Sequence, residues 1–376
     1  MKRSIWTGWK EKIAPYVFLA PFLFFILVFF GYAFVRVFYF SFTDYDMFSP
    51  PRWVWFKNYA NLFKEIQFLR ALQNSLSFML IVTAAQTALA LVLAVALNQK
   101  LRGIKFFRAA YYLPSITSSV VITLIFMWFF QRKGLINFLL TKIAENKPII
   151  LTFILLVVVL QALLVLKERL RRVPVSIFEP SYLVLSLLLG GVATFLLVEG
   201  GVVSPVEGVK AVETIWFNTR LTWPARSGPL AIPIPLLVIM ILNTWTTGPT
   251  FMLLYLAGLK EIPKELYEAA AVDGARGWQA FWHITVPQLR NVTFLVVTMG
   301  LIGTLQMFDQ VAFIGEQAPL DAVITLVYFV YVYAFPSSAA PNIGMASAAA
   351  IFLAVLTLLI VLVQKRFVSE RGEKVE

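Results

Sequence analysis

The chain of 376 residues has no cysteine, a single histidine and few charged residues, which make up 14% of its composition. The absence of cysteine excludes disulfides, thiol catalysis and cysteine metal sites. His283 stands without an HExxH motif or a second histidine, so we predict no metal site. No combination of nucleophile and base indicates a catalytic residue. We therefore expect a protein that is not an enzyme.

The sequence also lacks the phosphate-binding pattern GxxxxGK[ST]. A chain without this loop does not bind ATP phosphates by the P-loop route. We expect no cofactor in this chain, and any ATP-derived energy must come from another subunit.

The abundant residues are apolar: 60% of the chain is hydrophobic and 15% is aromatic, which exceeds the apolar share of ordinary soluble proteins. Several apolar runs have about 20 residues, the length of a helix that crosses the hydrocarbon layer of a bilayer. The net charge of +12 is spread without one basic patch, so it predicts no nucleic-acid partner. We predict an all-α polytopic protein embedded in a lipid bilayer.

The apolar runs predict about eight transmembrane helices, two of which form a helical hairpin. These spans lie at about 15–35, 76–97, 109–130, 149–166, 181–198, 231–257, 292–314 and 344–364. The first run is too long for a signal-peptide core and lacks a cleavage site, so we interpret it as a retained helix. The corresponding segments are an N-terminus with the first helix (1–40), an external loop with core helices (41–148), the inserted hairpin (149–200), the C-terminal core (201–364) and a tail (365–376).

Basic residues predict the orientation of these spans. Five segments carry four Lys or Arg residues each, including the acid-free link 100–108 and the link 167–172 inside the hairpin. The positive-inside rule places such segments in the cytoplasm, together with both termini. The predicted external loops 41–75 and 131–148 also carry four basic residues each, whereas loop 315–343 has none. Within 131–148, the stretch 134–143 is typical of an amphipathic helix along the outer surface.

One polar stretch, 259–290, separates two of the apolar spans. Pro263 suits the first turn of a helix, and Glu265 and Glu268 complement its positive end, which predicts a helix over about 263–273. Gly274 is the expected left-handed cap after that helix. A second short helix should follow and end near Pro287, with the aromatic residues Trp278, Phe281 and Trp282. The small residues Ala269, Ala270 and Ala271 indicate close docking into a partner.

This stretch resembles the EAA loop of ABC importer membrane subunits, because it reads IPKELYEAAAVDGA and then ITVP over 284–287. The similarity extends to Gly103, Arg108, Tyr112, Leu113 and Pro114, to GLIN over 134–137, and to Phe308 and Asp309. The resemblance implies a coupling helix that seats in a cytoplasmic ATPase dimer, through Glu268, Ala269, Ala270, Asp273, Gly274 and Pro287. It also implies a second permease subunit, an extracytoplasmic solute-binding protein, ATP and Mg bound by the ATPase, and a prokaryotic plasma (inner) membrane. It further implies a six-helix core, and relative to this core the helical hairpin within 149–200 is an insertion.

Two stripes of small or polar residues at helical spacing are candidates for the substrate path. One comprises Asn243, Thr246, Thr247 and Thr250, and the other comprises Gly300, Gly303, Thr304 and Met307. The resemblance implies that these helices hold a sugar, as in the maltose-type importer. Its aromatic and amide residues are replaced here by Thr250, Thr304 and Met307, which argues against maltose itself. Such stripes also serve simple helix packing in membranes, and this alternative stays open.

An ion-coupled secondary transporter is the second hypothesis for the function. Such carriers place ionisable groups within their spans, but here Asp309 is the only acid well inside a core span, and it could be functional or a boundary residue. A membrane enzyme or scaffold is a third hypothesis, without a catalytic group or soluble domain to favour it. The inserted hairpin could face lipid, dock another subunit or stabilise the fold, and the solute is not identified by the sequence.

Overall fold

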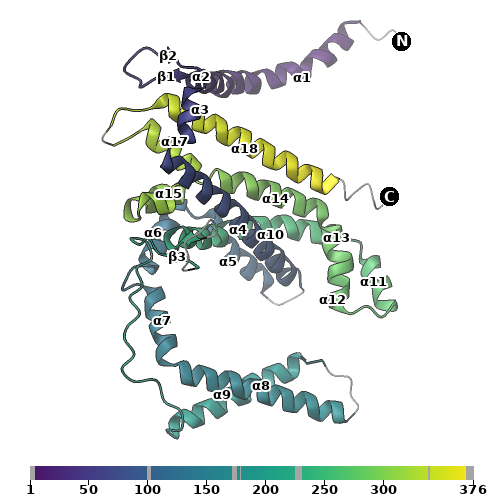
Figure 1. Ribbon diagram of the computed structural model, residues 1–376. Coiled ribbons are helices and arrows are strands. Elements are labelled where there is room, and N and C mark those ends of the chain that lie inside the picture. The colour runs from purple at the N-terminus through teal and green to yellow at the C-terminus, as the bar shows by residue number, and fades with distance from the viewer. Residues whose placement is uncertain are drawn as a thin grey trace. The chain divides into compact units, whose positions relative to one another are not determined.

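The computed structural model describes residues 5–99, 103–171, 176–177, 179–224, 231–337 and 339–369. These residues are mostly helical, with two short antiparallel ribbons (Figure 1). Seven helices of the described chain are long and apolar enough to cross a membrane, and a bent helix pair makes an eighth candidate. The predicted all-α fold with about eight spans is confirmed. The chain divides into two compact units, Met1–Leu124 with Phe217–Glu376, and Ile125–Trp216.

The first unit is built around α4 (Ile66–Leu97), which packs against α10 (Ile234–Glu261) and α14 (Arg290–Leu305) (Figure 1). Small residues of α4 such as Ala90 and Ala94 are fully buried, and Tyr255 of α10 is packed in the same cluster. Small side chains allow helix backbones to approach closely in a membrane. The three helices therefore form the rigid frame of this unit.

The start of α4 corrects the prediction that residues 41–75 form a loop before a helix at 76. The helix begins ten residues earlier, at Ile66. The polar residues that suggested a loop are buried and bonded: the Asn74 amide donates to the backbone carbonyl of Ile324, and the Ser75 hydroxyl accepts from the backbone N–H of Leu326. Residues 315–343, predicted as an external loop, likewise contain α16 (Leu320–Val323) and α17 (Leu326–Ala334), which pack against α4.

The predicted helix at 109–130 is wrong as one continuous span. It consists of α5 (Ile104–Ile116) and α6 (Ser119–Phe129), which meet at 96°. Pro114 lies near the end of α5, where it cannot donate a backbone hydrogen bond, and Thr117 is extended with φ −78° and ψ 145°. The Thr117 hydroxyl donates to the carbonyl of Leu113 at 2.8 Å. Side-chain hydroxyls thus satisfy backbone groups that the break would otherwise leave without a partner.

The predicted span at 292–314 is also interrupted. After α14 ends at Leu305, the chain leaves helical geometry at Phe308, and α15 (Asp309–Ile314) begins. The Thr325 hydroxyl, which is almost fully buried, donates to the Met307 carbonyl at 2.9 Å. This hydrogen bond from the start of α17 holds the break.

The first helical region is longer than the predicted 15–35. It comprises α1 (Ile5–Phe25), a π-helical segment (Ile26–Gly31) and α2 (Tyr32–Ser41), which packs against α18 (Ile343–Ser369). Short elements complete the unit: β1 (Thr43–Asp44), β2 (Arg52–Trp53), α3 (Lys57–Leu62), β3 (Thr222–Trp223), β4 (Ile232–Pro233), α11 (Lys264–Val272), α12 (Gly277–Ala280), a π-helical turn (Phe281–Thr285), α13 (Val286–Gln288) and a 3-10 turn (Gly315–Gln317).

The second unit contains α7 (Leu135–Glu145), α8 (Lys147–Leu170) and α9 (Pro180–Glu199). Helix α7 covers most of the predicted amphipathic stretch. Helices α8 and α9 pack against each other as the predicted hairpin. Gly190 permits this approach, because a Cβ atom there would lie 2.7 Å from Cγ2 of Val157.

Candidate functional site

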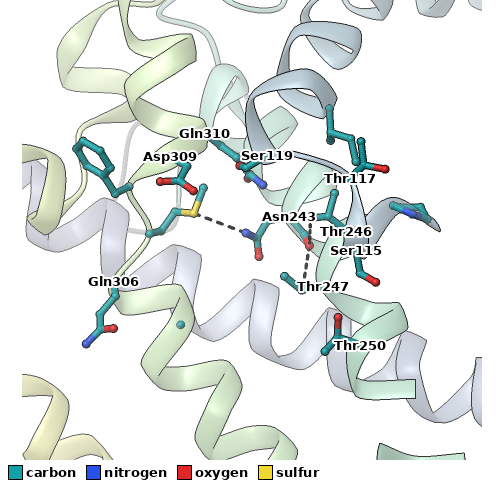
Figure 2. Close-up of a pocket in the computed structure, with 15 residues that line it drawn as sticks. Ser115, Thr117, Ser119, Asn243, Thr246, Thr247, Thr250, Gln306, Asp309 and Gln310 are labelled. Carbon is teal, nitrogen blue, oxygen red and sulfur yellow. Dashed lines mark hydrogen bonds between the residues drawn. The ribbon is translucent and has the colours of Figure 1, made fainter. Parts of the chain in front are cut away.

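A cavity of about 350 Å³ lies between three helical regions of the first unit (Figure 2). Its wall combines the α5–α6 bend, one face of α10, and the break between α14 and α15. The residues that line it are Pro114, Ser115, Thr117, Ser119, Ile122, Asn243, Thr246, Thr247, Thr250, Gly303, Gln306, Met307, Phe308, Asp309 and Gln310.

All four predicted residues of the α10 stripe line this cavity. Asn243 is central: its side-chain amide donates to the Met307 sulfur at 3.6 Å, and its backbone carbonyl accepts from the Thr247 hydroxyl at 2.7 Å. The Thr246 hydroxyl donates to the Leu242 carbonyl one turn earlier in α10. Thr250 is exposed, and within the described part of the chain its side chain forms no hydrogen bond. The hydroxyl of Thr250 is therefore the best placed of the stripe to meet a solute.

The second predicted stripe splits between two directions. Gly303 and Met307 line the cavity, and a Cβ atom added at Gly303 would meet nothing within 4 Å. Gly300 and Thr304 instead face α4: a Cβ atom at Gly300 would lie 2.5 Å from Nε2 of Gln86, and the Thr304 hydroxyl lies 3.3 Å from that of Thr83. The structure therefore brings six of the eight predicted path residues together and places these two in helix packing.

The sequence interpretation missed the contribution of the α5–α6 bend. Ser115, Thr117 and Ser119 bring hydroxyl groups to the cavity and lie across from the threonines of α10 in Figure 2. The signal was present as the run LPSITSS over 113–119, in which a proline and four hydroxyl residues interrupt an apolar span. Ser and Thr side chains commonly re-satisfy the backbone at such breaks.

The α14–α15 break supplies the remaining polar groups. Gln306 and Asp309 are exposed, and Gln310 is 5% exposed with no partner for its Oε1 atom within the described chain. Asp309 is the only charged side chain among the described residues of the lining. The cavity can thus offer hydroxyl, amide and carboxylate groups together with apolar surface, a combination suited to hydrogen-bonding a small polar molecule.

The polar stretch 259–290 forms a second candidate site, with the expected local geometry. Helix α11 begins after Pro263 and ends at Val272, and Gly274 has φ +78°. The N–H of Ala275 donates to the Ala270 carbonyl at 2.8 Å, and that of Gly274 donates to the Ala271 carbonyl at 3.1 Å. This pair of bonds is a Schellman motif, so the predicted left-handed glycine cap is confirmed.

The surface of this stretch is exposed. No residue of α11 is buried, and the exposed positions include Glu268, Ala269, Asp273, Gly274 and Pro287. A shallow cavity of about 310 Å³ lies between the glycine cap and the following turn, and Ala270 and His283 are part of its wall. The Tyr267 hydroxyl lies 2.8 Å from that of Thr285, which ties α11 to the helical segment before α14. All six predicted coupling residues therefore belong to one exposed element with a fixed internal geometry.

Comparison with known proteins decides the family. Residues 86–371 match the family described as binding-protein-dependent transport system inner membrane component. The chain belongs to this family. It is a permease subunit of an ATP-driven importer, which is a transport subunit rather than an enzyme, and it resides in the inner membrane.

Curated relatives align along almost the whole permease. A probable ABC transporter permease, YurN of Bacillus subtilis, is 27% identical over 97% of this chain and 99% of its own length. The arabinooligosaccharides permease AraP of the same organism is 27% identical over 98% and 94% of the two chains. The sn-glycerol-3-phosphate permease UgpA of Agrobacterium fabrum is 23% identical over 96% of each.

The fold has a solved counterpart. A chain of a bacterial ABC transporter for the acidic polysaccharide alginate superposes with a TM-score of 0.65 at 19% identity, over 97% of this chain and 98% of that one. Several residues of the motifs shared with the family have structural roles in this permease. Gly103 has φ +79° at the start of α5, Arg108 donates to the Leu97 carbonyl that ends α4, and Asn137 accepts from the Trp216 indole.

Proposed function

We propose that this permease forms one half of a translocation path for a neutral sugar or a related small polar solute, and that a second permease subunit forms the other half. The chemistry of the cavity supports this proposal most directly. Among the described residues, its lining carries serine, threonine, asparagine and glutamine groups and one carboxylate, Asp309, but no lysine or arginine. Sugar hydroxyls both donate and accept hydrogen bonds, so such groups match them.

The absence of a cation in the lining separates two kinds of solute that relatives carry. The named solutes of relatives include arabinooligosaccharides, sn-glycerol-3-phosphate and the acidic polysaccharide alginate. A phosphate or carboxylate is usually bound by Arg, Lys or backbone N–H groups. Asp309 would repel an anion at this position, and on this ground we favour a neutral carbohydrate.

The second part of the proposal concerns energy coupling. The exposed α11 docks into a cytoplasmic ATPase dimer, which binds ATP and Mg, and an extracytoplasmic solute-binding protein delivers the solute. Both termini lie in the cytoplasm on this proposal. The exposed alanines of α11 and the rigid glycine cap suit a helix that transmits a displacement. ATP binding in the partner would move α11, and the helices that frame the cavity would then open it alternately to either side of the membrane.

The test uses the complete transporter in proteoliposomes. Uptake of a panel of neutral oligosaccharides, acidic oligosaccharides and glycerol phosphates is measured with the cognate binding protein and internal ATP. We expect uptake of a neutral sugar, and transport of only anionic solutes would contradict the cargo assignment. Uptake that persists without ATP and collapses with an ionophore would favour the ion-coupled alternative.

A pair of variants then tests the cavity. Thr250→Leu replaces a hydroxyl of the lining with apolar bulk, and it should lower uptake about tenfold or more, because a hydrogen bond to the solute and room for it are lost. Thr244→Leu makes the same change on α10 outside the lining, where the hydroxyl bonds to the Met240 carbonyl, and it should transport normally. Equal uptake by the two variants would mean that the α10 stripe packs helices and does not contact the solute.

A further inference from the structure

The hairpin of α8 and α9 contains a further cavity, far more apolar than the solute cavity of the first unit. It has a volume of about 620 Å³, within the range of ~300–1,000 Å³ that ligand pockets occupy. Seven of its nine lining residues are aliphatic, among them Ala162, Val165, Leu166 and Leu183. The two polar members, Gln161 and Arg169, have different roles.

Gln161 builds the cavity and does not offer a binding group. Its side chain is 8% exposed; Nε2 donates to the Ile177 carbonyl at 2.8 Å, and Oε1 accepts from the Ser186 hydroxyl at 2.8 Å. The first bond ties the described part of the link before α9 to α8, and the second ties α9 itself to α8. Because both ends of the amide are satisfied inside the protein, the space beside it is left to an apolar occupant.

Arg169 gives the cavity a charged end. It lines the cavity and is exposed, three residues past Leu166 on the same face of α8. The other charged groups described at this end are Lys167, Glu168, Arg171 and Glu179. Glu168 pairs with Arg171 at 3.6 Å, and within the described chain neither Lys167 nor Arg169 forms an ion pair. With Glu179 included, the described charged groups here are three basic (Lys167, Arg169, Arg171) and two acidic (Glu168, Glu179), so this end of the cavity carries a net positive charge.

We propose that this cavity binds one acyl chain of an anionic phospholipid, whose phosphate is held by Arg169. Charge complementarity favours this occupant over a neutral lipid or an apolar protein helix, neither of which would use the cation. The orientation proposed above puts this basic end at the cytoplasmic leaflet, where anionic lipids attract Lys and Arg groups. The site lies in the inserted hairpin and is independent of solute and ATPase.

The test measures photolabelling of the purified transporter in nanodiscs. Two probes, phosphatidylglycerol and phosphatidylcholine, carry the same diazirine in the acyl chain, and labelled peptides of α8 and α9 are quantified by mass spectrometry. We expect phosphatidylglycerol to label the cavity in clear excess. Arg169→Gln should lower that labelling about fivefold, as loss of one basic group near the membrane surface predicts, and leave phosphatidylcholine labelling unchanged. Lys167→Gln, an equal loss of charge outside the lining, should change it less than about twofold.

A second pair of variants tests the apolar part. Ala162→Phe fills the cavity from an exposed position and should abolish specific labelling, while Leu163→Phe changes the neighbouring residue outside the lining and should not. Equal labelling by the two lipids overturns the anionic assignment. Unchanged labelling in Ala162→Phe, or cross-links that show another subunit in the cavity, overturns the lipid site. Solute uptake is not part of this readout, so its outcome is separate from that of the proposed function.

Discussion

The two glycines Gly300 and Gly303 lie one turn apart on α14, and the same substitution should have opposite effects at them. An alanine in a helix interior is favoured over glycine by about 0.5–1 kcal/mol. At Gly303 nothing lies within 4 Å of the new Cβ atom, so this gain is retained. At Gly300 the Cβ atom would lie 2.5 Å from Nε2 of Gln86 and 3.0 Å from Cγ2 of Thr83. Nε2 is the end of a flexible side chain, but Gln86 is only 1% exposed and is enclosed by its neighbours. Overpacking of an enclosed site costs about 1–3 kcal/mol, which exceeds the helical gain.

The crowding at Gly300 has a second consequence. Gln86 accepts a hydrogen bond from the Thr247 hydroxyl at 2.6 Å, and a displaced amide would weaken this link between α4 and α10. Loss of such a bond costs about 0.5–1.5 kcal/mol. We therefore expect Gly300→Ala to lower the stability of the permease, with a net cost of about 1–3 kcal/mol from these terms. Gly303→Ala should leave stability unchanged or slightly raised.

The assay compares the temperature at which each purified transporter loses its monodisperse peak, together with solute uptake in proteoliposomes. A third variant, Gly303→Leu, extends from the open position into the solute cavity and should abolish uptake while the complex stays assembled. If Gly300→Ala is as stable as Gly303→Ala, Gly300 is not closely packed against α4 as described. If Gly303→Leu transports normally, residue 303 does not face the path.

Three further predictions follow from local contacts. Gly274→Val should be strained by about 1–3 kcal/mol at φ +78° and should uncouple ATP hydrolysis from uptake. Gly274→Asn, a residue that tolerates this backbone geometry, should remain coupled. Normal transport by the valine variant would contradict a docking role for the loop. Thr325→Val should lower stability by about 1–3 kcal/mol, because the Met307 carbonyl loses its hydrogen-bond donor. Thermal unfolding measures this loss, with Thr357→Val as the control, because that change removes only a hydrogen bond within α18. Single cysteines at Gly274 or Arg171 should resist a membrane-impermeant thiol reagent in intact cells, and labelling of either from outside would reverse the proposed orientation.

Much of the fold followed from local sequence signals. The number of spans came from apolar runs, because each helix must satisfy its own backbone in lipid and therefore needs about 20 apolar residues. The glycine cap at Gly274 was predictable for a similar reason: only the preceding turn of α11 determines it, and the confirming hydrogen bonds run from Gly274 and Ala275 to Ala271 and Ala270. The two spans of the hairpin also followed from their apolar runs, whereas the resemblance to a six-helix family identified the hairpin as an insertion.

The site depended on tertiary structure. Hydropathy could not locate the 96° bend after Ile116 or the break after Leu305, because a span keeps its apolar composition while side chains such as Thr117 and Thr325 satisfy the broken backbone. Helical spacing put Gly300 and Gly303 in one stripe, but the position of α4 decided that one is packed and the other faces the cavity. Periodicity specifies which residues share a face of a helix, whereas what that face meets is decided by neighbouring helices that lie far away in the sequence.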